Sequence, residues 1–299
     1  MKRNHITLAQ VQAFVAVADT GSFTVASELL GMTQSAVSHS VATLEKELHV
    51  SLLARDSNGI FLTEIGKRVF AAAQEMLACA EKIRQETAAA VGFETGKVRL
   101  GSFPSVSARF FPGLLRQFRQ RYPSIEVILF EGTDDEVRNW IHTRAVDVGV
   151  VALPVEGLET ISIAQDEFLA VVAANHSLAK QNQIHINQLS QELFIMSKAG
   201  CKPIITAMFR KAKAIPKTQF EVIDLRTIFA MVQEGMGVTI VPEMALPSNL
   251  AGLHVLSLEP RQFRQLALAV KSLEATPAVT VFLSEAQNWA QSLFRGVTT

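Results

Sequence analysis

The chain has 299 residues, 48% of them hydrophobic and 19% charged, with two cysteines and with 28 Lys and Arg residues that balance 28 Asp and Glu residues. At roughly 150 residues for a typical domain, this length predicts two or three domains, and the apolar content excludes a disordered chain. The neutral balance excludes a polybasic chain that coats nucleic acid by bulk charge, two cysteines exclude a disulfide scaffold, and no apolar run approaches the roughly 18 residues of a membrane span.

The N-terminal residues allow two interpretations. A short basic start and Ala16-Val17-Ala18 resemble a secretory signal and its cleavage site, but Gln10 and Gln12 interrupt the apolar stretch. The same residues fit an amphipathic helix over 8–18 that begins with a capping box of Thr7 and Gln10. We expect the helix, and therefore a protein that stays in the cytoplasm.

Two further helices follow. Ser22 is placed to cap a short helix over 23–30, and Thr33 to cap a longer one that ends at Leu48, with a glycine-containing turn at Gly31-Met32 between them. Two helices joined in this way make a helix-turn-helix, whose second helix can lie in the DNA major groove. The sequence therefore predicts a DNA-binding module near its N-terminus.

A hairpin and a long helix complete this part of the chain. Asn58-Gly59 lies between two apolar runs and predicts a tight hairpin, because both central turn residues must tolerate positive φ. A hairpin after a helix-turn-helix is typical of a wing. Thr63 then opens a helix over 64–90 in which apolar residues repeat every seven positions, at Val69, Met76, Ile83 and Ala90. This repeat predicts a seam that pairs with a second helix, and packing onto its own domain is the alternative.

From about residue 97, short Val- and Ile-rich strands alternate with helices, which is typical of parallel α/β units. There are enough of these elements for two subdomains. Strands are predicted at 97–101, 125–130, 146–152, 169–173, 193–196, 219–223, 237–241 and 266–270. Helices are predicted at 109–121, 134–143, 203–213, 225–234 and 277–294.

Several motifs in both halves carry a family resemblance: Gly21-Ser22-Phe23-Thr24, Thr33–His39, Leu44–Leu48, Leu62–Gly66, Asp147–Val150 and Val232–Val238. On these residues the chain resembles LysR-type transcriptional regulators over nearly its full length. The resemblance implies an all-α winged helix-turn-helix domain with a long linker helix. An α/β two-lobed domain similar to periplasmic binding proteins would follow it.

The resemblance also implies boundaries. Residues 1–62 would be the DNA-binding domain, 63–92 the linker and dimerisation helix, and 93–299 the effector-binding domain. Within the last of these, lobe I would take 93–162 and 269–299, and lobe II would take 163–268.

The same resemblance places the DNA-contacting residues on the helix-turn-helix and the wing. Gln can bind adenine through two hydrogen bonds, Ser can bind a base or a phosphate, and free N–H groups at a helix start attract phosphate. Capping and solvation are the alternative roles of such side chains. The predicted DNA-binding residues are Ser22, Thr24, Thr33, Gln34, Ser35, Ser38, His39 and Arg55.

Two departures from the family pattern lower the expected affinity for DNA. Ser35 and His39 stand where family members often have proline and arginine, and a neutral histidine holds phosphate less well than arginine. Residues 1–91 carry eight Lys and Arg against nine Asp and Glu, a net charge of −1. We therefore expect a shallow salt dependence of DNA binding per protomer.

Polar residues follow the first predicted strands of the second half, at the edge where open α/β sheets bind ligands. Three of them supply hydroxyl groups there, and a helix that begins near Pro203 offers free N–H groups to a small anion. Helix capping and loop polarity are the alternative. The predicted effector-binding residues are Ser102, Phe103, Ser105, Thr133, Ala152, Cys201 and Lys202.

Cys201 permits a second hypothesis. At a helix start beside Lys202 its thiol should have a depressed pKa, and its position resembles that of the reactive cysteine in peroxide-sensing members of the family. Cys79 lies on the predicted linker helix, so no resolving partner is evident in this half of the chain. A thiol-based redox-sensing regulator is therefore the alternative function.

We predict a sequence-specific transcriptional regulator that binds double-stranded DNA and is modulated by a small anionic effector between two lobes. Pairing of linker helices implies a homodimer, and the family usually assembles as a dimer of dimers. The sequence has no G-x-S-x-G, P-loop, C-x-x-C or H-E-x-x-H motif, so an enzyme or a plain ligand-binding protein is the weaker alternative. No histidine has metal-ligand spacing, and we expect no metal, no cofactor and no membrane partner.

Overall fold

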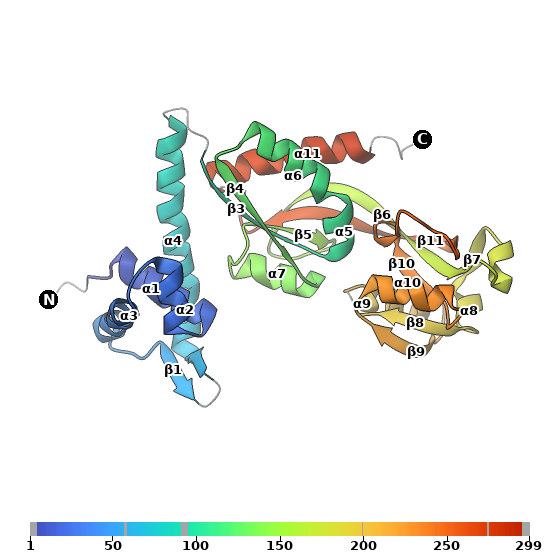
Figure 1. Ribbon diagram of the computed structural model, residues 1–299, viewed down its shortest axis with the longest axis horizontal. Helices are drawn as coiled ribbons and strands as arrows, with labels where there is room; N and C mark the ends of the chain where they lie inside the picture. Colours follow the sequence, from blue (N-terminus) through green and yellow to red (C-terminus); the bar gives the residue numbers. More distant parts are fainter. Residues whose placement is uncertain (1–4, 57–58, 91–94, 199, 274, 295–299) are drawn as a thin grey trace. The chain divides into compact units, whose positions relative to one another are not determined.

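The computed structural model describes residues 5–56, 59–90, 95–198, 200–273 and 275–294 (Figure 1). The chain divides into two compact units, residues 1–93 and residues 94–299. The first is built from helices and one small hairpin, the second from helices and a large mixed sheet, as the sequence predicts. Within the described ranges, none of the helices is both long and apolar enough to cross a bilayer.

Three short helices open the first unit, and each begins at its predicted cap: α1 (Leu8–Thr20), α2 (Phe23–Leu30) and α3 (Gln34–Leu48). Thr7 forms the predicted capping box with Gln10, and the hydroxyls of Ser22 and Thr33 accept backbone N–H groups in the first turns of α2 and α3. α1 is two residues longer than predicted. It ends at Gly21, where a left-handed φ of 62° favours glycine.

The core of the first unit is an apolar cluster shared by α1, α2, α3 and the first half of α4 (Glu64–Ala90). Each helix has apolar residues at helical spacing, so these faces pack together. Phe14 meets Phe70 edge to face, with ring centroids 6.2 Å apart. The fully buried members are Val11, Ala13, Phe14, Val17, Ala26, Val37, Val41, Leu44, Leu52 and Ala73.

The predicted hairpin is present as the antiparallel strands β1 (Leu53–Asp56) and β2 (Gly59–Leu62). Asp56 pairs with Gly59, so Gly59 belongs to a strand rather than to the centre of the turn. Residues 57 and 58 themselves lie outside the described ranges.

The long helix α4 begins at the predicted position and approaches the chain before the hairpin closely. Thr63 Oγ1 accepts the N–H of Gly66 at 2.9 Å, which caps the helix. A Cβ on Gly66 would lie 2.0 Å from the carbonyl oxygen of Leu52, so this contact requires glycine. In the predicted pairing seam, Met76 is 42% and Ile83 is 67% exposed, and the chain leaves this part of the seam uncovered.

A seven-stranded mixed sheet runs through the second unit in the order β10-β6-β11-β5-β3-β4, with β7 (Gln183–His185) beside β11. β3 (Gly96–Ser102) is parallel to β4 (Ile125–Glu131) and to β5 (Val148–Ala152), as predicted. The other main strand pairs are antiparallel. β6 (Glu159–Ala173) pairs in this way with β10 (Thr239–Pro242) and with β11 (Leu253–Val270), and β11 also pairs in this way with β5. The predicted parallel arrangement therefore holds for only part of the sheet.

Two lobes are built around this sheet, and the long strands β6 and β11 run through both (Figure 1). Lobe I packs α5 (Pro104–Arg109), α6 (Phe111–Arg121), α7 (Asp134–His142) and α11 (Pro277–Phe294) around β3, β4 and β5. Lobe II holds β7, β10, the parallel pair β8 (Leu193–Ser197) and β9 (Lys217–Val222), and the helices α8 (Ile186–Leu189), α9 (Lys202–Lys211) and α10 (Leu225–Gln233). Each lobe has its own core: Phe110, Phe118 and Phe282 lie in the first, and Phe168, Phe194 and Phe209 in the second.

The main differences from the sequence prediction concern the strands that connect the lobes. β6 begins at Glu159 rather than at 169, and β11 begins at Leu253 rather than at 266. Charged residues inside these strands, among them Asp166 and Arg264, interrupt the apolar run by which a buried strand is recognised. The short elements β7, α5, α8 and the 3-10 turns at Ser177–Lys180 and Glu243–Ala245 are not predicted either.

Candidate functional site

The start of α3 presents four exposed polar side chains on one face: Gln34, Ser35, Ser38 and His39. Residues three and four apart lie on the same side of a helix, so these side chains form one continuous strip. The opposite side of α3 is held in the core by Val37, Val41 and Leu44. The exposed polar face of this half-buried helix can therefore contact a large partner such as the major groove of DNA.

Two of the other predicted DNA-binding hydroxyls are helix caps. Thr33 Oγ1 accepts the N–H of Ala36 at 3.2 Å, and Ser22 Oγ accepts the N–H of Val25 at 3.4 Å. Capping, the alternative role of these side chains, is thus present, and it fixes the first turns of both helices. Thr24, two residues beyond Ser22, is exposed.

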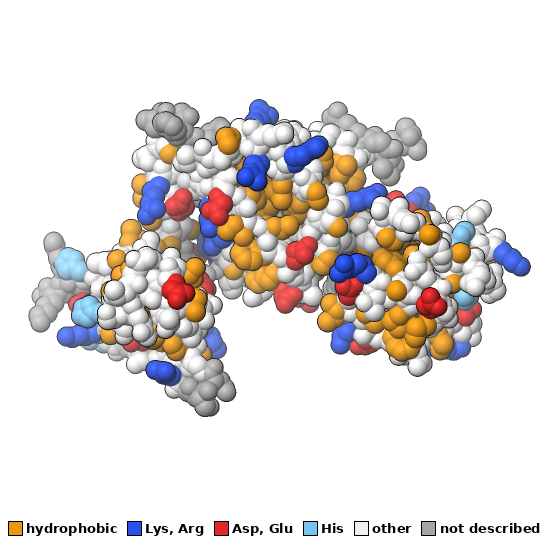
Figure 2. All heavy atoms as spheres, in the orientation of Figure 1, with side chains coloured by type: hydrophobic (Ala, Val, Ile, Leu, Met, Phe, Trp, Pro, Cys, Tyr) orange, Lys and Arg blue, Asp and Glu red, His pale blue; other side chains and the backbone are white. Residues whose placement is uncertain are grey.

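The hairpin carries Arg55, which is exposed and lies opposite Ile60 in the strand register. Figure 2 shows acidic and basic side chains interspersed over the face that it displays, in keeping with the net charge of −1 for residues 1–91. We therefore expect the first unit to have only weak sequence-independent attraction to phosphate.

A cavity of about 250 Å³ lies between the two lobes of the second unit. Lobe I contributes the end of β5, the start of α7 and Phe103; lobe II contributes the start of α9; Arg264 of β11 completes the wall. This is the edge at which parallel strands end and at which open α/β sheets bind ligands. The lining residues are Phe103, Asp134, Asp135, Arg138, Ala152, Leu153, Pro154, Gly200, Cys201, Pro203, Ile204 and Arg264.

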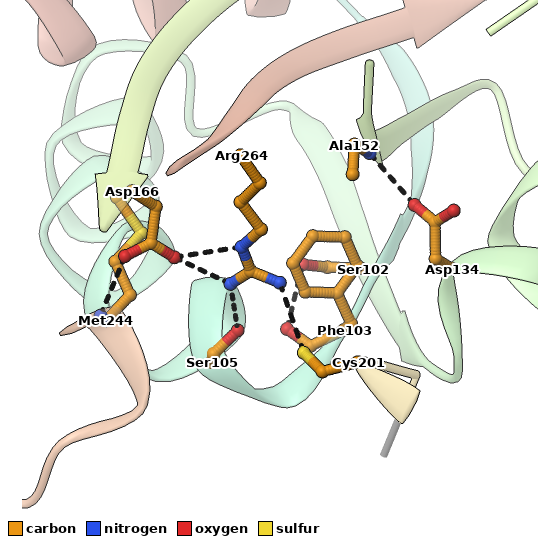
Figure 3. Close-up of polar contacts among 9 residues, drawn as sticks. All are labelled: Ser102, Phe103, Ser105, Asp134, Ala152, Asp166, Cys201, Met244 and Arg264. Atoms are coloured by element: carbon orange, nitrogen blue, oxygen red, sulfur yellow. Dashed lines mark hydrogen bonds and ion pairs between the residues drawn. The ribbon is translucent and has the colours of Figure 1, made fainter. Parts of the chain in front are cut away.

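Arg264 is the buried cation of this cavity, with a side chain 5% exposed. Its Nε and Nη2 lie 3.0 and 2.7 Å from Asp166 Oδ2, and Nη2 donates to Ser105 Oγ at 2.9 Å (Figure 3). Nη1 lies 3.7 Å from Cys201 Sγ, and the guanidinium carbon lies 4.8 Å from the centre of the Phe103 ring. One side chain thus contacts β6, lobe I and the start of α9 in lobe II.

A second polar network forms the wall of lobe I. Asp134 Oδ1 accepts the N–H of Ala152 at 2.9 Å (Figure 3). Asp134 Oδ2 lies 2.6 Å from Arg138 Nε. Arg138 Nη2 donates to the carbonyl of Ala152 at 2.8 Å. The start of α7 is thereby fastened to the end of β5. Asp135, the next residue, is exposed and makes no hydrogen bond or ion pair with any residue that the structure describes.

The structure brings together part of the predicted effector-binding set. Phe103, Ala152 and Cys201 line the cavity. Ser105 reaches it through its hydrogen bond to Arg264.

Ser102, Thr133 and Lys202 are not among the residues that line this cavity. Ser102 is fully buried, and its hydroxyl donates to the next backbone carbonyl at 3.3 Å. Thr133 forms a capping box with Glu136 at the start of α7. Lys202 Nζ lies 2.5 Å from Glu221 Oε1, so its charge is already paired.

The thiol of Cys201 does not have the depressed pKa that the sequence predicts. The side chain is buried, and burial raises its pKa above the usual range, although the nearby charge of Arg264 opposes that shift. Cys201 is therefore a protonated thiol at neutral pH. The redox-sensing alternative depends on a reactive thiolate, which a protonated thiol does not supply. The second cysteine, Cys79, is exposed on α4 in the other unit.

Sequence reasoning misses the charged residues of the cavity. Asp134 and Arg138 follow Thr133 closely and could have been found by extending the same strand-edge argument around the next turn of helix. Asp166 and Arg264 carry no such signal, because they are 98 positions apart and meet only through the antiparallel pairing of β6 and β11. Among the described side chains, no three His, Cys, Asp or Glu residues are grouped so as to hold a metal ion.

Comparison with known proteins agrees with both halves of this description. Residues 8–67 match the family model "Bacterial regulatory helix-turn-helix protein, lysR family", and residues 92–291 match "LysR substrate binding domain". The HTH-type transcriptional regulator YvbU of Bacillus subtilis is 39% identical over 286 residues, which cover 94% of this chain and 98% of that relative.

Two solved structures have a similar fold. A full-length variant of OxyR from Pseudomonas aeruginosa superposes with a TM-score of 0.79 at 23% identity, over 96% of this chain and 95% of that one. Full-length CbnR in complex with its target DNA superposes with a TM-score of 0.62 at 22% identity, over 95% of this chain and 100% of that one. At such identities the likeness concerns the fold alone.

Proposed function

Because the chain belongs to the LysR family of DNA-binding transcriptional regulators, we propose that the exposed face at the start of α3 reads its operators and that a small ligand in the cavity between the lobes controls it. The family assignment makes the chain a regulator with an effector-binding domain. We propose which residues contact DNA and which residues bind the effector.

The observation that carries the DNA-binding half is the strip of Gln34, Ser35, Ser38 and His39 on a helix whose other face is buried. Gln34 suits the two hydrogen-bonding atoms of an adenine edge, and the serine hydroxyls suit a base or a phosphate. Around this strip we assign contacts with the DNA backbone to Ser22, Thr24, Thr33 and Arg55.

The effector half of the proposal rests on Arg264. Arg264 lines the cavity, and among the described residues its Nη1 has the sulfur of Cys201, a weak acceptor, as its partner. An anionic group of the effector would give this nitrogen a strong acceptor, with Phe103 and Ala152 as the apolar walls. Since the cavity lies between the lobes, a ligand that prefers one degree of lobe closure would shift the population of that state.

We further propose a homodimer paired through α4, and a tetramer formed as a dimer of dimers. The exposed Met76 and Ile83 on one seven-residue repeat of this 27-residue helix support the pairing. Two paired heads would bind the two halves of a DNA site with two-fold symmetry.

The functional boundaries that we propose are 1–62 for DNA binding, 63–92 for pairing and 93–299 for effector binding. The two lobes are 93–162 with 269–299, and 163–268. Ala164 and Leu266 pack in the first core, and Phe168 and Leu258 in the second. The cores therefore support a passage between the lobes within β6 and β11 that lies a few residues inside the proposed bounds of 163–268. A regulator of this kind would act beside the chromosome, in the cytoplasm, and would bind its effector without converting it.

Selection of genomic DNA fragments by the purified full-length protein, with and without a metabolite extract, tests the proposal. We expect enrichment of a motif with two-fold symmetry, and its loss in the variant Gln34→Ala combined with Ser38→Ala. The variant Gln12→Ala, at an exposed position of α1, is the matched control and should retain the motif. Recovery of fragments without any preference, in the presence of extract, would overturn it.

A further inference from the structure

The charges around the cavity indicate a more specific ligand than a small anion. Three carboxylates surround it, those of Asp134 and Asp135 in the wall and that of Asp166 behind Arg264. Two guanidinium groups, of Arg138 and Arg264, oppose them, which leaves a net charge of −1. A ligand with a single negative charge would make the net charge of the occupied site −2. Like charges repel more strongly in such a partly desolvated site than in water.

Most of these charged groups already satisfy one another. Asp134 is occupied by Arg138 and by the N–H of Ala152, and Asp166 by Arg264 and by the N–H of Met244. These contacts hold the walls together and leave little hydrogen-bonding capacity for a ligand.

Arg138 Nε lies 2.6 Å from Asp134 Oδ2 in an ion pair but makes no hydrogen bond with any described residue. Two further groups in the wall retain free capacity, and they have opposite charges. Nη1 of Arg264 has the thiol of Cys201 as its one partner among the described residues, at 3.7 Å. Asp135 has no hydrogen-bonding or ionic partner among them, and its acceptor atoms remain available. One group requires an acceptor, preferably an anion, and the other requires a donor, preferably a cation.

We propose that the effector is a small zwitterion, namely an amino acid, whose carboxylate binds Nη1 of Arg264 and whose ammonium group binds Asp135. This inference rests on the proposed binding of an effector between the lobes, and it adds the second charged group. An amino acid brings no net charge, so the site remains at −1 while both free groups are paired.

The size and the apolar walls of the cavity fit this class of ligand. Its volume of about 250 Å³ is below the roughly 300–1,000 Å³ of pockets that hold drug-sized ligands. Phe103, Ala152, Pro203 and Ile204 line the same cavity and offer an apolar surface to a short side chain. The protonated thiol of Cys201 adds no negative charge beside the carboxylate.

Calorimetric titration of the full-length protein at neutral pH tests the proposal. The probes are the twenty common L-amino acids, β-alanine and γ-aminobutyrate, each paired with the carboxylic acid that lacks its amine, such as propionate for alanine. We expect at least one amino acid to bind at least tenfold more tightly than its matched acid. Binding of an acid as tight as that of its amino acid, or failure of every amino acid to bind, overturns the proposal.

Two variants locate the effect. Asp135→Asn should weaken binding of the amino acid at least tenfold and should leave binding of the matched acid unchanged or tighter, because the ammonium contact is lost and one negative charge is removed from the site. Glu131→Gln removes another exposed carboxylate of the same lobe, outside the cavity, and should change neither. An Asp135→Asn protein that retains full affinity for the amino acid contradicts the assignment.

The same titration separates failure of this inference from failure of the proposed effector site. Ile204→Trp fills the cavity from its lobe II side. If an acid without an amine binds and Ile204→Trp abolishes its binding, the site between the lobes stands and the zwitterion is wrong. If the ligand binds equally well to Ile204→Trp, the site itself is wrong.

Discussion

Arg264 and Asp166 lie directly opposite each other on β11 and β6, and their side chains form a buried ion pair (Figure 3). The arginine side chain is 5% and the aspartate side chain 1% exposed, and Asp166 Oδ1 also accepts the N–H of Met244 at 3.1 Å. These two strands are the ones that pass from one lobe to the other. A ligand that contacts Arg264 therefore contacts the connection between the lobes.

Replacement of Asp166 should destabilise the second unit strongly. Asp166→Asn leaves the guanidinium group of Arg264 buried without its counter-charge, and we expect the free energy of unfolding to fall by about 3–5 kcal/mol. Urea unfolding followed by circular dichroism measures the change. Arg226→Gln is the control, because that arginine side chain is 94% exposed in its pair with Asp224 and such pairs contribute below about 1 kcal/mol. Similar losses in both variants would contradict the role assigned to burial.

Gly66 should not tolerate a methyl group. In Gly66→Ala the new Cβ would lie 2.0 Å from the Leu52 carbonyl oxygen, and backbone cannot move aside as a flexible side chain can. We expect the first unit to lose about 3 kcal/mol, the upper part of the range for overpacked sites. Scanning calorimetry of the full-length protein measures the shift, with Arg68→Ala on the exposed side of α4 as the control. An unchanged transition would show that α4 can move away from Leu52.

The fold could be predicted to the extent that local pattern decides it. Thr7, Ser22, Thr33 and Thr63 each begin a helix where the sequence places a cap, because capping depends on residues only three or four positions apart. The long strands could not be predicted in full. Charged residues lie within them, and two of these pairs, Asp166 with Arg264 and Glu167 with Arg261, neutralise each other only once the antiparallel strands have met.

The candidate sites follow the same division. The exposed face of α3 follows from helical spacing within one short segment. The cavity depends on contacts between residues far apart in sequence, and only Phe103, Ala152 and Cys201 of the predicted set reach it. The sequence alone gives no reason to exclude Lys202 from the cavity, since its pairing with Glu221 depends on how α9 packs beside β9.

Cys201 should make the stability of the second unit fall at alkaline pH. Burial holds the pKa of this thiol above its usual value near 8.5, so the folded chain keeps a proton that the unfolded chain releases first. Stability then decreases as the pH rises above about 8.5, where the folded state binds more protons than the unfolded state. Urea unfolding over this range should show a shallower decrease for Cys201→Ser. A stability of the wild type that rises over this range would mean that the pKa is lowered.

The salt dependence of DNA binding should be shallow. In the described part of the first unit, Lys67 pairs with Glu64 and Arg84 with Glu81. The cations there without an ion pair are Lys46, Arg55, Arg68 and Lys82, and the last of these lies in the second half of α4, beyond the helix-turn-helix and the hairpin. Three phosphate contacts correspond to a slope of about −3 per protomer in a plot of log affinity against log salt.

Fluorescence anisotropy with a labelled operator measures this slope. Arg55→Gln should reduce its magnitude by about 1, because one phosphate contact is lost. A wild-type slope steeper than about −5 would contradict the charge argument, since it would need more phosphate contacts than these cations supply.

Gln34 should determine specificity rather than stability. Its side chain is exposed at the start of α3, so Gln34→Ala removes no packing, and we expect an unchanged thermal midpoint. If Gln34 binds an adenine edge, its loss costs about 1–3 kcal/mol, or roughly 5- to 150-fold in affinity for the operator, with little change for unrelated DNA. Anisotropy titrations against the operator and a scrambled duplex measure the ratio, and Gln12→Ala on α1 is the control. Equal loss of affinity for both duplexes would show that Gln34 contacts only the backbone.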